Sequence, residues 1–143
     1  MSHEVSLLRL YALRLVYALN FVGLGMNVWP NLLNHPEPWD PVKGVAISFW
    51  AALSLLSALG IRYPLKMLPV LMMQLTYKTI WLIFVGYPLW SAGDMSPAAT
   101  AVFNACAMGF VIDLVVIPWS HVLKNLATAP GDRWRIARTP SAA

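Results

Sequence analysis

Long apolar blocks separated by short polar segments form the dominant pattern of the chain. The blocks cover residues 6–29, 44–60, 67–90 and 99–122. Their lengths approach the roughly 20 residues that an α-helix needs to cross the hydrocarbon core of a bilayer. We therefore predict an all-α integral membrane protein, in which residues 1–126 form a four-helix bundle and residues 127–143 form a basic C-terminal tail.

The polar segments carry residues that usually end helices. Prolines crowd the stretch after the first block, at Pro30, Pro36, Pro38 and Pro41. Because proline removes a backbone donor and clashes with the preceding turn, this stretch is predicted to leave the helix after Trp29 and to form a turn-rich loop. The first block is longer than the apolar part of a secretory signal peptide and contains Arg9 and Arg14, so we expect a membrane helix there.

Composition agrees with a membrane protein. Of the 143 residues, 59% are hydrophobic and 11% are charged, whereas soluble domains carry about 25% charged residues. The net charge of +4 comes from cations spread over several segments instead of one basic stripe. We therefore expect the lipid bilayer as a partner and no nucleic acid.

The distribution of charge predicts the orientation. The chain start, the connection after the second block and the tail share most of the basic side chains, namely His3, Arg9, Arg62, Lys66, Lys124, Arg133, Arg135 and Arg138. The other two loops hold Lys43 together with Glu37, Asp40 and Asp94. By the positive-inside rule both termini face the cytoplasm, which agrees with an even number of spans.

Two ionisable residues interrupt the apolar blocks. Lys78 lies in the third block and Asp113 in the fourth. Ionisable groups are costly at membrane depth and usually face protein or water, so we predict that these two pair with each other. Counting 1.5 Å per residue from the cytoplasmic side, Arg14, Lys78 and Asp113 lie at about 12, 16 and 14 Å, a common level.

Other residues are expected to join this pair. Gln74 lies one helical turn from Lys78, and Tyr77 and Trp81 flank it. The predicted ligand-binding or structural polar cluster therefore consists of Lys78, Asp113, Arg14, Gln74, Tyr77 and Trp81. Two cations beside one anion leave a positive charge, which a bound anion or polar ligand, a neutral Lys78, or an Arg14 that extends to the headgroups would balance.

Small residues indicate which helix faces pack closely. On the fourth block Ala101, Ala105 and Gly109 stand four apart and lead to Asp113, so we expect Asp113 to point into the bundle. The second block repeats small residues at Gly44, Ser48, Ala52, Ser54 and Ala58 and is predicted to be a packing helix. The amides of Asn20, Asn27, Gln74 and Asn104 are expected to form hydrogen bonds between helices.

Known catalytic motifs do not occur in the sequence. It has no nucleotide-binding loop, G-x-S-x-G, H-E-x-x-H or paired-cysteine motif, so we assign no catalytic residue and no metal ligand, and the sequence does not identify a cofactor. His3 with His121 could ligate haem or a metal, and the loop residues His35, Glu37 and Asp40 could bind a divalent ion, but solvated histidines and a rigid proline turn are simpler explanations. Cys106 is expected to be a packing residue.

The order of features resembles that of a known family. A first helix ends in Phe21-Val22-Gly23-Leu24-Gly25, a proline-rich loop follows, and a short second helix leads through Gly60-Ile61-Arg62-Tyr63-Pro64 into the third. This order is similar to that of small four-helix bacterial membrane proteins of the DoxX-like group. The resemblance implies a four-helix bundle in the bacterial inner (cytoplasmic) membrane. Some members of the group are subunits or partners of membrane oxidoreductase systems that handle sulfur compounds, quinones or oxidative stress.

Several functions remain open from the sequence. The first is a non-enzymatic subunit or assembly partner of a larger membrane complex, a redox complex included, with a membrane protein or a second copy as its partner. The alternative is a binder of a quinone, lipid or similar amphipathic molecule, with Lys78, Asp113 and Gln74 at its polar end. Weaker possibilities are a proton or ion carrier and a retinal-type Schiff base at Lys78. The ion pair could also do no more than fix the register of two helices.

Overall fold

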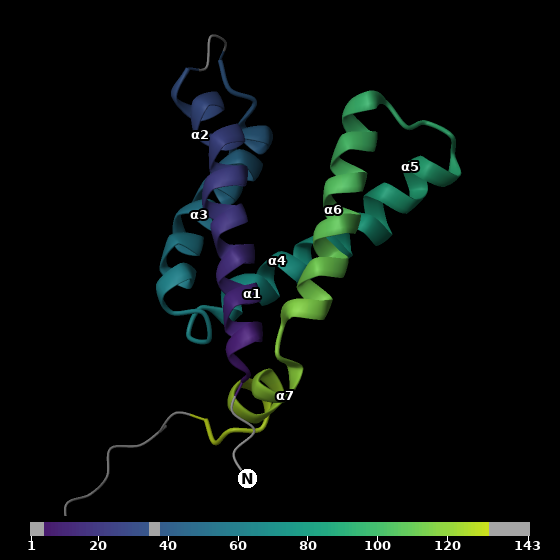
Figure 1. The fold of residues 1–143 in the computed structure, drawn as a ribbon. Helices are drawn as coiled ribbons and strands as arrows, with labels where there is room; N and C mark the ends of the chain where they lie inside the picture. Colours follow the sequence, from purple (N-terminus) through teal and green to yellow (C-terminus); the bar gives the residue numbers. More distant parts are fainter. Residues whose placement is uncertain (1–4, 35–37, 132–143) are drawn as a thin grey trace, which may run out of the picture.

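The described part of the chain is helical. The computed structural model describes residues 5–34 and 38–131, and these contain helices joined by short loops, without a β-strand (Figure 1). Within these residues, four stretches are long and apolar enough to cross a membrane: Leu7–Leu33, Pro41–Arg62, Leu68–Ser91 and Pro97–Val116. The prediction of an all-α chain with four candidate membrane spans is confirmed.

The first stretch is a continuous helix with a π-helical segment at its centre. It consists of α1 (Leu7–Ala18), η1 (Leu19–Leu24) and α2 (Gly25–Leu33). Pro30 lies inside α2, so the prediction that the helix ends at Trp29 was wrong. A proline removes one hydrogen bond and crowds one carbonyl, whereas the remaining backbone groups of an apolar segment have no better partner than the helix itself.

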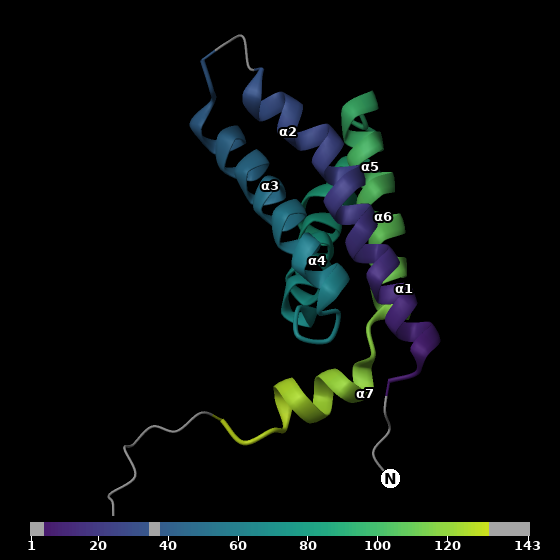
Figure 2. The same cartoon turned by 60° about the vertical axis from the view of Figure 1, so that its left-hand side comes forward.

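The second stretch, α3 (Pro41–Arg62), runs antiparallel to the first and packs along it (Figure 2). It begins earlier than predicted because the Asp40 side chain accepts a hydrogen bond from the backbone N–H of Lys43 at 2.8 Å, which caps the first turn. Of the predicted packing row, Ser54 is fully buried, whereas Ser48 and Ala52 are exposed.

The third and fourth stretches form a second hairpin. The third consists of α4 (Leu68–Trp81), η2 (Leu82–Gly86) and α5 (Tyr87–Ser91), and it packs against α6 (Pro97–Val116). Pro69 lies in the first turn of α4, where its missing N–H costs nothing. Pro88 lies in the first turn of α5, and the helix continues past it to Ser91.

The fourth predicted block breaks before its end. It was expected to remain helical to Val122, but α6 ends at Val116. Ile117 is extended, with ψ 124°, because the Pro118 that follows it disfavours the helical conformation. The chain then forms α7 (Trp119–Val122) and η3 (Leu123–Ala127), which run across the end of the helices instead of continuing along them (Figure 2).

The two hairpins meet at one end and diverge toward the other (Figure 1). The end at which they meet carries the exposed basic residues Arg9, Arg62, Lys66 and Lys124, and we name it the basic end. The buried apolar core lies there and is formed by Leu13, Val16, Tyr17, Leu68, Leu71, Ile117 and Val122. Of the predicted C-terminal tail, Ala127 closes η3, and residues 132–143 lie outside the described residues.

Candidate functional site

A buried polar cluster joins three of the four apolar stretches. Gln74 and Lys78 lie one turn apart on α4, so their side chains share a face of that helix. Asp113 lies on α6, which packs against α4, and Asn20 lies in η1 of the first stretch. We call these four residues the polar cluster.

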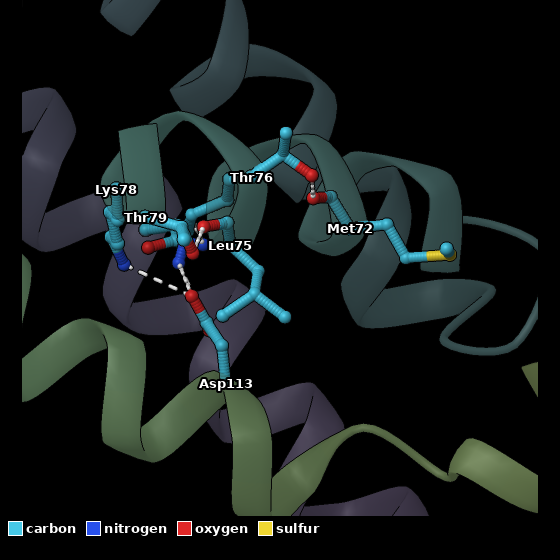
Figure 3. Close-up of polar contacts among 8 residues, drawn as sticks. Met72, Leu75, Thr76, Lys78, Thr79 and Asp113 are labelled. Carbon is cyan, nitrogen blue, oxygen red and sulfur yellow. Dashed lines mark hydrogen bonds and ion pairs between the residues drawn. The ribbon is translucent and has the colours of Figure 1, made fainter. Parts of the chain in front are cut away.

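The carboxylate of Asp113 is at the centre of the cluster. Its Oδ2 lies 3.1 Å from Nζ of Lys78, an ion pair that crosses from α6 to α4 (Figure 3). Gln74 Nε2 donates to the same carboxylate, at 3.1 Å from Oδ1 and 2.9 Å from Oδ2. Exposed fractions are 1% for Asp113, 3% for Gln74 and 8% for Lys78. Both carboxylate oxygens are therefore satisfied from within the chain and away from solvent.

Asn20 extends the cluster to the first hairpin. Its Nδ2 donates to Oε1 of Gln74 at 2.6 Å. Because the Gln74 amide accepts from Asn20 and donates to Asp113, it is held in one orientation and links the two hairpins. Asn20 was predicted only as one of several amides that form bonds between helices. Its place in the cluster depends on η1 coming within hydrogen-bond distance of α4, which no single residue in the sequence indicates.

Gly109 makes room for the lysine ammonium. A Cβ at position 109 would overlap Nζ of Lys78, so a side chain here would force the end of the lysine to shift from its place in the ion pair. The sequence placed Gly109 on one row with Asp113, Ala105 and Ala101, but both alanines are exposed. Residues four apart on a helix rotate by about 40° per step, so the row leaves the contact face within three steps.

Arg14 lies outside the cluster. Its Nε donates to the backbone carbonyl of Ile61 at 3.2 Å, and its guanidinium lies over the Tyr11 ring at 5.4 Å. It therefore stabilises the last turn of α3, where helix carbonyls lack partners within the helix. Because Arg14 is held there, the structure brings one cation to Asp113 and not the two that the sequence suggested.

The predicted aromatic members serve helix packing. The Tyr77 ring meets Phe49 of α3 edge to face, with ring centroids 5.6 Å apart. Trp81 packs beside Gly86, where an added Cβ would come within 2.9 Å of its ring. Tyr77 thus joins α3 to α4, and Trp81 lies against the end of η2, in the same apolar stretch.

The other candidate ligands are not assembled into a site. His3, His35 and Glu37 lie outside the described residues, and Asp40 is the cap of α3. Over residues 5–34 and 38–131, no group of three or more His, Cys, Asp or Glu side chains is placed to hold a metal ion. Cys106 is buried in α6, with 7% of its surface exposed.

An open apolar groove lies near the end opposite to the basic end. Its volume is about 670 Å³, and its lining consists of Leu32, Trp39, Pro41, Gly44, Val45, Ser48 and Phe49. The lining comes from the end of α2, the loop and the first half of α3, and it includes no residue of the polar cluster. The groove and the cluster are therefore separate features.

Gln74→Met tests the hydrogen bonds that hold the carboxylate. We expect it to lower the free energy of unfolding by about 1.5–3 kcal/mol, the contribution typical of hydrogen bonds to a charged group. The measurement is equilibrium unfolding of the purified protein in mixed micelles. Thr76→Val on the same helix is the matched control, because the Thr76 hydroxyl is exposed and donates to the carbonyl of Met72 within its own helix (Figure 3). If Gln74→Met and Thr76→Val lower the free energy of unfolding equally, the hydrogen bonds from Gln74 to the Asp113 carboxylate do not stabilise the fold.

Comparison with protein-family models, with curated proteins and with solved structures finds no match for this chain. The resemblance to the DoxX-like group therefore stays a prediction from sequence. What the cluster can do follows from its geometry alone: it is an ion pair whose carboxylate and amide groups bond one another across three helices. Such an arrangement fixes the relative position of the two hairpins.

Proposed function

We propose that this chain is a multi-pass protein of the bacterial inner membrane, with both termini in the cytoplasm, that acts as a non-enzymatic subunit or assembly partner of a larger membrane complex. The four apolar stretches support the membrane location. The exposed cations at the basic end support the orientation. The resemblance to the DoxX-like group favours a redox complex as the assembly.

One side chain carries this proposal. Asn104 is exposed on α6, about 10 Å from the start of a helix long enough to cross a membrane. Its amide has no hydrogen-bond partner among the described residues, although the sequence predicted that it would bond another helix of this chain. In hydrocarbon, an unpaired amide costs several kcal/mol. A helix from another subunit that offers a hydrogen-bonding side chain at this level would remove the cost.

The surroundings of Asn104 suit such a helix. Ala101 and Ala105 are exposed beside it on the same face, and small residues let two helix backbones approach closely. Of the most apolar 18-residue part of α6, 11% is buried, compared with 33% for the stretch Leu68–Ser91. Most of α6 therefore lacks cover from the described residues of its own chain. The partner that fits is a membrane-spanning helix with a polar side chain facing Asn104.

Asn104→Leu tests the assembly. The tagged protein is purified from native membranes in mild detergent, and we expect the variant to retain its partner about 3- to 30-fold less well, as hydrogen bonds of about 0.6–2 kcal/mol between membrane helices imply. Asn104→Gln should restore part of the association because it keeps an amide at the same place.

The matched control is Met108→Leu, an apolar exchange on the same exposed face. It should leave the association unchanged. If Asn104→Leu retains the partner as well as the original protein does, α6 is not the docking face. The mass of the purified assembly shows whether the partner is a second copy of this chain or a different membrane protein.

A second candidate function is the binding of an amphipathic small molecule such as a quinone or lipid. The apolar groove favours it, because its volume of about 670 Å³ lies within the usual range for ligand sites. Solvent extraction of the purified protein, followed by mass spectrometry, should then release a stoichiometric ligand. Ser48→Phe would fill the groove and abolish the retention of that ligand, while Asn104→Leu would leave it unchanged.

A further inference from the structure

The helical segment formed by α7 and η3 has two distinct faces. Trp119, Val122, Leu123 and Leu126 recur at the spacing of one helical face. Ser120, His121, Lys124 and Asn125 occupy the other face. The segment runs across the basic end, at an angle to the four apolar stretches (Figures 1 and 2). A short amphipathic helix in this position is typical of a segment that lies in a membrane surface.

The apolar face is only partly covered by the protein. Val122 is 4% exposed and belongs to the buried core, so it fixes the segment to the end of the hairpins. Leu123 and Leu126 are 56% and 50% exposed. Trp119 donates its indole N–H to the carbonyl of Leu114 at 2.8 Å, which holds the turn between α6 and α7. The segment is therefore held in place while Leu123 and Leu126 remain exposed.

The charge at this end is of one sign in the part of the chain that the structure describes. Arg9, Arg62, Lys66 and Lys124 are exposed there. Of the acidic residues in residues 5–34 and 38–131, Asp40 and Asp94 lie at the opposite end. Asp113 is the third, and it is buried in the polar cluster. Among the residues that the structure describes, the basic end thus presents cations beside an exposed apolar row, without a neighbouring carboxylate.

We propose that α7 and η3 lie in the headgroup layer at the basic end and bind anionic phospholipids. Leu123 and Leu126 enter the boundary of the acyl chains, and Lys124 on the polar face contacts lipid phosphate. Arg62 and Lys66 add exposed positive charge at the same end of the molecule, and exposed cations attract anionic headgroups. This inference rests on the proposed membrane location but not on the proposed partner of α6.

The first test measures how deep the segment lies. The full-length protein with Cys106→Ala is reconstituted in lipid nanodiscs, and spin labels are attached through Leu123→Cys, Leu126→Cys, His121→Cys or Asn125→Cys. Labels at 123 and 126 should be more accessible to oxygen, and labels at 121 and 125 more accessible to a water-soluble nickel chelate. Equal accessibility of all four labels to the nickel chelate would overturn the proposal.

The second test measures the preference for anionic lipid. Nanodiscs of phosphatidylcholine with phosphatidylglycerol are compared with phosphatidylcholine alone, and bound lipid is counted by native mass spectrometry. We expect the protein to retain phosphatidylglycerol, and Lys124→Gln or Arg62→Gln to weaken this about fivefold each. Lys43→Gln, which removes an exposed cation from the other end, is the matched control and should have no effect.

The outcomes are separable from those of the assembly experiment. If Lys43→Gln reduces the retention of phosphatidylglycerol as much as Lys124→Gln does, or if neither variant has an effect, the segment does not bind anionic lipid. Asn104→Leu should leave the accessibility pattern and the lipid preference unchanged. A loss of partner association in that variant therefore reports on α6 alone, and a loss of lipid preference in Lys124→Gln reports on the basic end alone.

Discussion

Replacing Asp113 by leucine should lower the free energy of unfolding by about 3–5 kcal/mol, the loss expected when one partner of a buried ion pair is removed. The change leaves the buried Lys78, a residue with 8% of its surface exposed, without a counter-ion for its ammonium, and it removes the acceptor of both hydrogen bonds from Gln74. The measurement is equilibrium unfolding of the protein in mixed micelles. A free energy of unfolding within about 0.5 kcal/mol of the original value would contradict a buried pair, because this is the range of ordinary surface substitutions.

The double variant Lys78→Met with Asp113→Leu separates the stability of the pair from the cost of an orphaned charge. Since a buried ion pair can often be replaced by apolar residues without loss, we expect the double variant to regain most of the stability that Asp113→Leu loses. If the double variant instead loses the sum of the free energies lost by the two single variants, the two side chains act independently. If the double variant folds stably but does not support the protein's function in the cell, the ion pair has a role beyond fixing the register of the two helices.

The contrast between Lys78 and Arg14 shows how far the sequence can predict such a cluster. A shared depth in the apolar blocks was sufficient to predict that Lys78 and Asp113 lie together. The same argument also predicted, wrongly, that Arg14 joins them, because depth along a helix does not specify the direction in which a side chain points. The Arg14 guanidinium finds a carbonyl at the end of α3 instead. End carbonyls attract cations in every helix, and their position depends on packing, so the sequence alone could not separate the two outcomes.

The prolines show the same limit for the fold. The lengths of the apolar blocks predict the four candidate membrane spans of the described chain, because length and hydropathy are local properties. Pro118 breaks its helix and turns α7 aside, whereas Pro30 remains inside α2. A proline inside a helix costs a similar free energy at either position. Whether the helix breaks therefore depends on the contacts that the chain gains when it leaves the helix. After Ile117 it gains the burial of Val122 in the core, a long-range contact that the sequence does not reveal.

Gly60→Ala should be the most damaging single-methyl addition in α3. A Cβ at this position would overlap the ring of Tyr17, which is fully buried and whose hydroxyl donates to the carbonyl of Pro64 at 3.1 Å. A ring held at both ends cannot move aside without opening the contact between α1 and α3. We expect the free energy of unfolding to fall by about 3 kcal/mol, the upper end of the range for overpacked cores.

Gly44→Ala is the matched control, because the same substitution in the same helix meets nothing within 4 Å. It should leave stability unchanged or raise it by up to about 1 kcal/mol, since alanine restricts the unfolded chain more than glycine does. Equal effects at the two positions would contradict the close packing of Gly60. In a Tyr17→Leu background Gly60→Ala should cost much less, because the smaller side chain leaves room for the methyl group, and this coupling would assign the loss to the ring and not to helix propensity.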